Sequence, residues 1–481
     1  MLKMQDRGCT GSCKINERRR GRFFVSTVLT EEDSTFMRVT GIIMECNPFH
    51  EGHDYLLKEA RRITQADYII VVMSGDYVQR GEPAVFDKYI RADQVLKAGA
   101  DLVLELPLYM ACGSAEYFAR GGIFQLEKLG VVTDLCFGSE TGDLDHLAQC
   151  ARILSLAEDT TGPVSLFQEI YQEKLRCALS SGLPFPAART QALEGILPSA
   201  PNDLLGVEYC RALSACRSAV RPHAIRRIDV PSATQHRQEL LKNREALSGL
   251  FPDLTKTGLI KAGLTEADPA EADPVKTPAD FRLPGAWPQT GVTDVPVFPV
   301  GPDDFSPVLL YALCMNEAGL DQYTDVSRSL ADRIRNLLPQ FRGFSDFADL
   351  LKTRNLTRTR VSRCLLHILL QLRKERLQAL VSQGYALYAR PLAMNRQASP
   401  LYAAIRGNSS IPLLSKLSRA GSLLSPEAYS FLQEEIRSED LYVHTLAGVS
   451  RRHGAGQYRP PRAQQRRLGL LQDPRIFNYN S

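Results

Sequence analysis

The chain has 481 residues, of which 44% are hydrophobic and 23% are charged, so its length allows two or three domains with sizeable cores. No apolar run approaches the roughly 20 residues that a membrane-spanning helix needs, so the sequence predicts no membrane span. The formal net charge of +4 neither requires nor excludes a polyanionic partner.

Residues 1–36 are basic and polar and show no sustained helical or strand period. The arginines at 18–20 are not followed by the apolar segment of a secretory signal. We therefore predict a disordered leader, with the working protein beginning at Met37.

The eleven cysteines are scattered, and several lie inside apolar patterns, where a thiol behaves as a small hydrophobic group. This usage favours a reducing cytoplasm over a disulfide framework. Cys9 and Cys13 lack a second pair of ligands at suitable spacing, so no zinc site is predicted.

From residue 41 to 140, apolar strands alternate with helices, which is typical of an α/β fold with a parallel sheet covered on both faces. The predicted strands are 37–44, 67–73, 101–106 and 134–138, and a helix at 52–65 joins the first two. Ligands of such sheets bind at the carboxyl ends of the strands, which here carry polar or turn residues.

The rest of the chain is predicted to be mainly helical. A helix begins at Pro201-Asn202-Asp203, and a further strand is predicted at roughly 224–228. Residues 251–303 are rich in Pro and Asp and are interpreted as a linker or insertion. Residues 304–481 are strongly helical to about 390 and end in a basic tail.

The stretch from Thr40 to Leu56 combines a predicted strand, an Asn47-Pro48 turn and the motif His50-x-Gly52-His53 at a helix start. Such a junction can bind an anion, and two imidazoles beside it can donate to phosphate oxygens. The alternative is that the histidines only cap or pack the helix, because single short motifs carry a high false-positive risk. A nucleotide is the first ligand to consider.

Three other polar segments follow predicted strands. The loop from Ser74 to Pro83 is either a binding loop or a surface turn. Lys88 and Arg91 begin a helix and reach either a phosphate or solvent. Ser232, Thr234 and Arg237 suit the β- and γ-phosphates of a nucleotide, against an ordinary capping box.

Five blocks in register carry a resemblance: GIIMECNPFHEGH, SGDYVQRGEPAVFDKYIRA, GADLVLELP, SAEYFA and CFGSE. Together they resemble the bacterial tRNA(Met) cytidine acetate ligase family of the HxGH nucleotidyltransferase superfamily. The match is dense from about 39 to 140 and returns in FSPVLLYALCMNEAGLDQYTDVSRSLADRIRN and LTRTRVSRCLLHILL. The resemblance implies a Rossmann-like ATP-binding domain at 37–250, followed by a mainly helical tRNA-binding region at 304–481.

The resemblance also implies a two-step reaction and its residues. ATP and acetate give acetyl-adenylate and pyrophosphate, and the acetyl group then passes to N4 of the wobble cytidine of elongator tRNA(Met). His50, His53 and Arg237 are expected to stabilise the charge that develops on the phosphates. The expected ATP contacts are Ile43, Met44, Glu45, Cys46, Asn47, Pro48, Phe49, His50, Glu51, Gly52, His53, Asp54, Tyr55, Leu56, Gly138, Asn202, Arg227, Ile228, Ser232 and Thr234.

A magnesium ion bridging the phosphates is expected, although the sequence shows no dedicated set of metal ligands. The sequence departs from the family where Ile228 to Ser232 joins two motifs almost directly and where His236 replaces an apolar residue. Two alternatives therefore stay open. One is another HxGH adenylyltransferase acting on a small phosphorylated substrate, and the other is a tRNA-binding protein with impaired catalysis.

Basic clusters in the helical half are the predicted tRNA surface, with a merely solvated basic face as the alternative. Tyr458 is available to stack on a base. The first cluster is Lys352, Arg354, Arg358, Arg360 and Arg363, followed by Arg373, Lys374 and Arg376; the second is Arg451, Arg452, Arg459, Arg462, Arg466 and Arg467.

Overall fold

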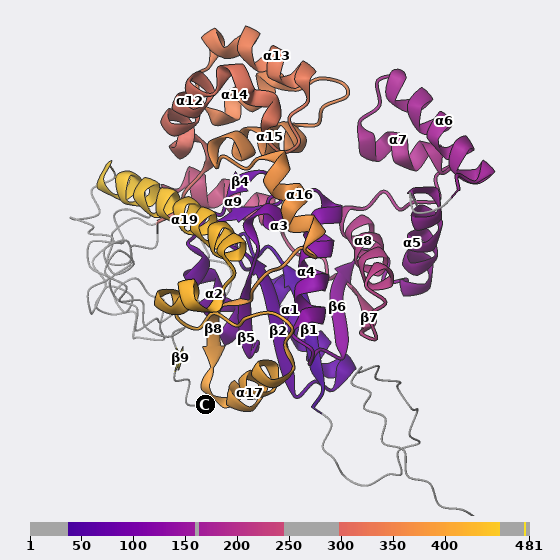
Figure 1. Ribbon diagram of the computed structural model, residues 1–481, viewed down its shortest axis with the longest axis vertical. Helices are drawn as coiled ribbons and strands as arrows, with labels where there is room; N and C mark the ends of the chain where they lie inside the picture. Colours follow the sequence, from indigo (N-terminus) through magenta and orange to yellow (C-terminus); the bar gives the residue numbers. More distant parts are fainter. Residues whose placement is uncertain (1–36, 159–162, 245–297, 453–475, 478–481) are drawn as a thin grey trace, which may run out of the picture. The chain divides into compact units, whose positions relative to one another are not determined.

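The computed structural model describes residues 37–158, 163–244, 298–452 and 476–477 (Figure 1). The expectations for residues 1–36, including Cys9 and Cys13, for most of 251–303, and for the basic tail beyond Arg452 lie outside these residues. Within the described part, no helix is long and apolar enough to cross a membrane.

A seven-stranded sheet in the order β7-β6-β1-β2-β5-β8-β9 forms the centre of the described residues. The strands from β7 to β5 are parallel, whereas β8 runs antiparallel to β5. A short hairpin, β3 and β4, lies outside this sheet. The bounds are β1 Val39–Met44, β2 Tyr68–Ser74, β3 Tyr77–Val78, β4 Glu82–Pro83, β5 Leu102–Leu106, β6 Asp134–Ser139, β7 Arg221–Arg226, β8 Arg390–Asn395 and β9 Ile476–Phe477.

Helices cover both faces of the sheet, as the alternation of strands and helices predicted. Ile42 and Met44 of β1 pack with Leu57 of α1 and Val95 of α2, while Ile43 points into the other core with Phe118 of α4. Successive residues of a strand face opposite sides, so β1 contributes to both cores. The bounds here are α1 Glu51–Thr64, α2 Lys88–Lys97, α3 Leu108–Ala111, α4 Ala115–Lys128, α5 Leu144–Glu158, α6 Leu166–Ser180, α7 Phe185–Ala192, α8 Pro201–Ala215 and α9 Ala233–Lys242.

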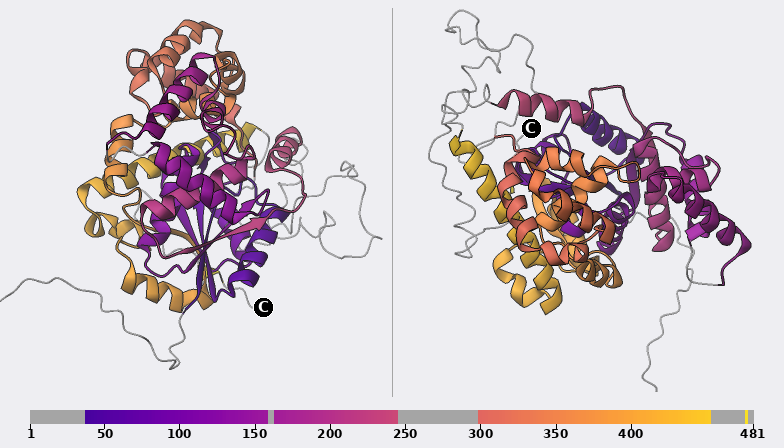
Figure 2. Two further views of the ribbon diagram at one scale, coloured as in Figure 1. Left: turned by 90° about the vertical axis from the view of Figure 1, so that its right-hand side faces the viewer. Right: turned by 90° about the horizontal axis from the view of Figure 1, so that it is seen from above.

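The residues after 298 are mainly helical, as predicted, and Figure 2 shows these helices in two further views. Their bounds are α12 Ser306–Met315, α13 Arg328–Leu337, α14 Phe344–Leu351, α15 Arg358–Leu369, α16 Lys374–Ser382, α17 Ser399–Asn408, α18 Ala420–Leu423 and α19 Pro426–Arg452. Short 3₁₀ turns lie at Pro302–Phe305, Glu317–Gln322, Leu338–Gln340, Arg396–Ala398 and Leu417–Arg419. The predicted α/β, Rossmann-like fold class with a mainly helical C-terminal part is confirmed.

Two sequence-based expectations about strands are wrong in detail. β8 was not predicted at all, and β7 begins and ends earlier than the predicted 224–228. The register with β6 explains the second difference, because Asp134 of β6 pairs with Arg221 and Ser139 pairs with Arg226. β6 ends at Ser139, so the paired register ends at Arg226, and the N–H of Arg227 still donates to the Ser139 carbonyl at 2.9 Å.

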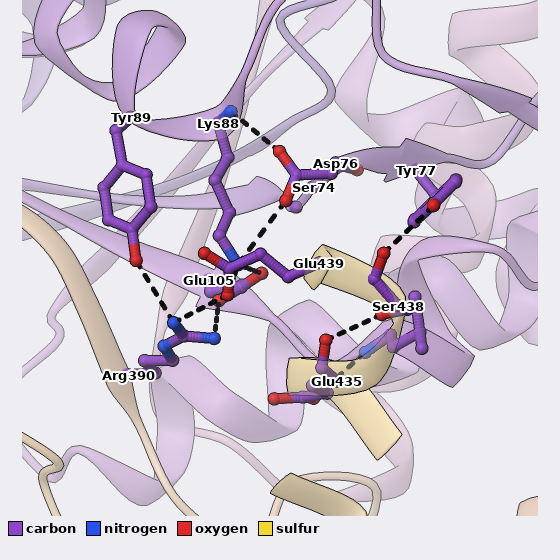
Figure 3. Close-up of polar contacts among 12 residues, drawn as sticks. Ser74, Asp76, Tyr77, Lys88, Tyr89, Glu105, Arg390, Glu435, Ser438 and Glu439 are labelled. Atoms are coloured by element: carbon purple, nitrogen blue, oxygen red, sulfur yellow. Dashed lines mark hydrogen bonds and ion pairs between the residues drawn. The ribbon is translucent and has the colours of Figure 1, made fainter. Parts of the chain in front are cut away.

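A buried ionic cluster joins β8 and α19 to the sheet (Figure 3). Lys88 Nζ lies 2.6 Å from Glu105 Oε1 on β5 and 3.0 Å from Glu439 Oε2 on α19. Arg390 of β8 contacts the same two carboxylates at 3.0 and 2.9 Å. Lys88 is only 1% exposed, so it neither reaches a phosphate nor faces solvent, and both expectations for it are wrong.

Arg91 is also fully buried and has a structural role. Its guanidinium donates to the carbonyls of Glu45 at 2.8 Å, Ser74 at 3.1 Å and Gly75. It therefore joins the ends of β1 and β2, the edge of the sheet at which the candidate site lies.

Candidate active site

A cavity of about 310 Å³ lies at the carboxyl ends of β1 and β6, beside the start of α1. Its volume is within the range of small-molecule sites. Many of the predicted contacts line it: Ile43, Met44, Glu45, His50, Gly52, His53, Tyr55, Leu56, Gly138, Asn202, Arg227, Ile228 and Ser232. The other predicted residues, Cys46, Asn47, Pro48, Phe49, Glu51, Asp54, Thr234 and Arg237, are not in its lining.

The two motif histidines cap α1 and line the cavity at the same time. His50 is the N-cap residue, and its Nδ1 accepts from the backbone N–H of Gly52 at 3.1 Å. His53 Nδ1 accepts in return from the backbone N–H of His50 at 3.2 Å. This is a capping box in which both partners are histidines. The two interpretations of the motif, a helix cap and a part of the pocket, are therefore compatible.

These hydrogen bonds fix the state of both rings. Burial lowers the pKa of His50 to about 4, with further contributions from His236 and Arg227. The pKa of His53 is also lowered, by burial and then by His50. Both rings are thus neutral near pH 7, and because each Nδ1 accepts, each Nε2 carries the proton. Each of the two rings therefore provides one neutral N–H donor.

His236, which replaces an apolar residue of the family pattern, stacks on the motif. Its ring centroid lies 5.8 Å from that of His50 with an interplanar angle of 26°, and the His50 and His53 centroids are 3.9 Å apart. At the start of α1 the His50 ring is therefore stacked with His236 and tilted by 35° against His53. Gly52 is needed beside it, because a Cβ there would lie 2.9 Å from His50 Cε1.

On the opposite side, β6 is tied to the start of α8 by reciprocal contacts. The Glu140 carboxylate accepts from the Asn202 side-chain amide at 2.6 Å and from the backbone N–H groups of Asn202 and Asp203 at 3.4 and 2.9 Å. The Asp203 carboxylate accepts from the Ser139 hydroxyl and from the Glu140 N–H at 2.9 Å. Asp203 therefore does not cap α8, whose N-cap is Ala200, but holds the loop that carries Gly138 and Glu140.

Arg237 lies behind the cavity, where burial lowers its pKa. It donates to the Asn47 carbonyl at 2.7 Å and to the Thr234 hydroxyl at 3.1 Å, and its Nε lies 3.7 Å from Glu82 Oε2. Ser232 forms the capping box of α9 with Gln235, the alternative that the sequence had left open, and it also lines the cavity.

Arg80 and Tyr209 line the cavity but were not predicted as site residues. Arg80 Nε is 4.0 Å from Glu45 Oε2, and its Nη1 donates to the Thr234 hydroxyl at 3.3 Å. Arg80 belongs to the loop from Ser74 to Pro83, so the polarity of that loop was a usable signal. Tyr209 lies in the middle of α8 within an apolar pattern, and no sequence signal distinguishes it from a core tyrosine.

Several residues of the first basic cluster of the helical half form ion pairs or hydrogen bonds within the protein. Arg376 pairs with Glu434 at 2.8 Å, Arg363 with Asp325 at 3.5 Å, and Lys374 donates to two backbone carbonyls. Arg358 contacts Asp349 at 2.9 Å and Glu82 at 3.6 Å. By contrast, no acidic side chain among the described residues pairs with Lys352, Arg354 or Arg360.

Comparisons with known proteins agree on one family. A family model described as HIGH Nucleotidyl Transferase matches residues 37–456. A protein of Acetivibrio thermocellus named tRNA(Met) cytidine acetate ligase is 34% identical over 417 residues, which cover 85% of this chain and 95% of the relative. A Clostridium perfringens protein of the same name is 32% identical over 430 residues, 85% of this chain and 98% of the relative.

Two crystal structures of Thermotoga maritima TmcAL share this fold at 27% sequence identity. The one bound with alpha-thio ATP has a TM-score of 0.69 and covers 85% of this chain and 95% of its own. The apo form has a TM-score of 0.70 and covers 88% and 98%.

Proposed function

This chain belongs to the HIGH nucleotidyl transferase family and, within it, to the tRNA(Met) cytidine acetate ligases, and we propose that it activates acetate with ATP and acetylates N4 of the wobble cytidine of elongator tRNA(Met). The observation that carries the site assignment is the pair of neutral imidazoles whose Nδ1 atoms are engaged, so that two N–H donors belong to one cavity. A nucleotide triphosphate offers the acceptors that such donors need.

In the first step an acetate oxygen attacks the α-phosphorus of ATP and pyrophosphate leaves. Negative charge grows on the phosphate oxygens, so preorganised donors and cations supply most of the catalysis and no protein nucleophile is required. His50 and His53 provide N–H donors, and Arg227 and Arg80 provide fixed positive charge at the same cavity. Arg237 is proposed to act from behind it, by holding Asn47 and Thr234.

Mg²⁺ is proposed to arrive with the nucleotide. No group of three or more His, Cys, Asp or Glu side chains in the described part of the chain is arranged to hold a metal ion. The carboxylate of Glu140 is already occupied by three N–H donors. The phosphates and water are therefore the main ligands in this proposal, as is usual for Mg²⁺, and no step is assigned to the ion.

The second step needs a bound tRNA, and we propose that the exposed Lys352 and Arg354, with Arg360, contribute to its binding. Acetate is the proposed acyl donor. A cytoplasmic location is proposed as well, because the nine cysteines that the structure describes are all free thiols.

The direct test combines protein, ATP and labelled acetate with and without elongator tRNA(Met). We expect acetate-dependent pyrophosphate exchange without tRNA and labelled N4-acetylcytidine with it. Adenylylation of a small phosphorylated substrate in place of acetate would favour the cofactor-forming alternative. Tight tRNA binding without any adenylate would favour the binding protein that has lost catalysis.

His50→Asn tests the role of the imidazole without removing the helix cap. Asn is among the best N-cap residues, so α1 should keep its stability. Its side chain cannot place a second donor where the ring Nε2 lies, so the exchange rate should fall by about 10²–10³-fold. A variant with a wild-type Tm and a wild-type exchange rate would contradict the assignment of His50.

A further inference from the structure

Two buried polar atoms of the cavity lining are unused by the contacts described so far. Glu45 follows β1, and Tyr209 lies on α8 with its ring centroid 5.4 Å from that of Phe137. Glu45 Oε1 and the Tyr209 hydroxyl are both shielded from solvent and have no hydrogen-bond partner among the described residues. Leaving a buried polar group unpaired is unfavourable, so a ligand that supplies the missing partners is favoured.

Elimination leaves Glu45 as the proton acceptor of the cavity. Among the described side chains that line it, Glu140 is occupied by three N–H donors. The Nδ1 atoms of His50 and His53 already accept backbone hydrogens, so the neutral rings can only donate. Glu45 keeps one carboxylate oxygen without any donor, while its other oxygen faces Arg80.

We propose that Glu45 is the general base of the acetyl-transfer step and that the Tyr209 hydroxyl donates a hydrogen bond to the acyl oxygen. This inference rests on the proposed function and assigns its second step. The lone pair of the cytidine N4 amine forms a bond to the acetyl carbon, the bond from that carbon to the phosphate oxygen of AMP breaks, and its electron pair leaves with AMP. One N4 proton passes to Glu45.

The electrostatic surroundings make Glu45 a stronger base than an exposed carboxylate. Burial raises the pKa of Glu45 above its usual range, and the guanidinium groups of Arg80 and Arg237, followed by a hydrogen bond from the Gln79 backbone, oppose that rise. Glu82 faces the same carboxyl and adds to the rise. A carboxylate whose pKa is raised by burial accepts a proton more readily than a carboxylate in water, and general-base catalysis requires such a proton acceptor.

The Tyr209 hydroxyl can donate a hydrogen bond in both steps, because each step offers an acyl oxygen as the acceptor. Burial and the neighbouring Glu45 raise the pKa of Tyr209, so its hydroxyl stays protonated and can donate. In the first step the acceptor is a carboxylate oxygen of acetate, and in the second it is the carbonyl oxygen of the acetyl group.

The test separates the two half-reactions. For Glu45→Gln we expect acetyl transfer from pre-formed acetyl-adenylate to elongator tRNA(Met) to fall by about 10²-fold or more, a loss at least tenfold larger than any loss of acetate-dependent pyrophosphate exchange. Equal loss of both half-reactions, or unchanged transfer, would overturn the assignment of Glu45. Glu116→Gln, which removes the same charge from the first turn of α4 beside the cavity, should leave both rates unchanged.

Tyr209→Phe completes the test. It should slow both half-reactions, because the acyl oxygen loses its donor in each, and a wild-type rate in either would overturn the role of Tyr209. Failure of the proposed function gives a different result: the wild-type protein would then form neither acetyl-adenylate nor N4-acetylcytidine, whatever the variants do.

Discussion

At the scale of single residues, Gly52 leaves room for the His50 ring, which both caps α1 and lines the cavity. Its N–H holds His50 Nδ1, and an added Cβ would lie 2.9 Å from the ring. Gly52→Ala should therefore displace the His50 ring and weaken ATP binding by about tenfold, the loss of roughly one hydrogen bond. The stability of the helix should change little, since the higher helix propensity of Ala, about 1 kcal/mol, offsets a displaced cap that is worth about as much.

The matched control for this substitution is Gly407→Ala in α17, where a Cβ would meet nothing within 4 Å. Both variants gain helix propensity, but Gly52→Ala also displaces a cap, so the Tm of Gly407→Ala should equal or exceed that of wild type and the Tm of Gly52→Ala should stay close to it. Titration calorimetry with ATP then separates them. If Gly52→Ala binds ATP as the control does, the ring of His50 does not contribute to nucleotide affinity.

At the scale of elements, the β3–β4 hairpin connects the cavity to the basic start of α15. Gly81 in its turn has φ +79° and packs directly on the backbone of Ser362 and Arg363. Glu82 lies 3.7 Å from Arg237 and 3.6 Å from Arg358. Arg358 is thus part of the support of the site, whereas Arg354 and Arg360 are free of acidic partners within the described residues.

The double variant Arg354→Gln and Arg360→Gln should therefore weaken tRNA binding and make the negative slope of log K against log salt shallower by about 1.4–1.8, while pyrophosphate exchange stays at the wild-type rate. Arg396→Gln with Arg406→Gln removes the same charge from exposed positions near α17 and should not change the slope. Equal slopes for both double variants would mean that the start of α15 is a solvated basic face.

The elements also show what the sequence could predict. β1, β2, β5 and α1 carry their own periodic patterns, and the His50 motif lies where such patterns place it. β8 has no such pattern: Arg390-Pro-Leu-Ala-Met-Asn contains Pro391, and its strand form depends on β5, about 285 residues earlier, and on the pairing of Arg390 with Glu105. Tyr209 was missed for the same reason, because distant contacts set its position beside the cavity.

At the scale of the whole described unit, α19 is held to the sheet by buried polar contacts. The Glu435 carboxylate accepts from the Tyr388 hydroxyl at 2.7 Å and from the Leu108 N–H at 3.2 Å. Tyr77 and Tyr442 add hydrogen bonds between α19 and the segment from 77 to 84. α19 thereby stabilises the edge of the sheet that carries the cavity.

Glu435 makes this attachment dependent on pH. Burial, followed by the charge of Glu105, raises its pKa from 4.5 to about 7, while Tyr388 and Arg390 oppose the rise. Between these two pH values the folded protein keeps a proton that the unfolded chain releases, so the free energy of unfolding falls as the pH rises. The loss between pH 6 and pH 8 should be about 1 kcal/mol, and Glu435→Gln, which has no proton to lose, should not show it.

Glu427→Gln, at an exposed position in the first turn of the same helix, should retain the wild-type loss. Denaturant unfolding of the three proteins at both pH values measures the difference; an identical loss in all three would assign the pH dependence to other groups and leave α19 attached equally at either pH.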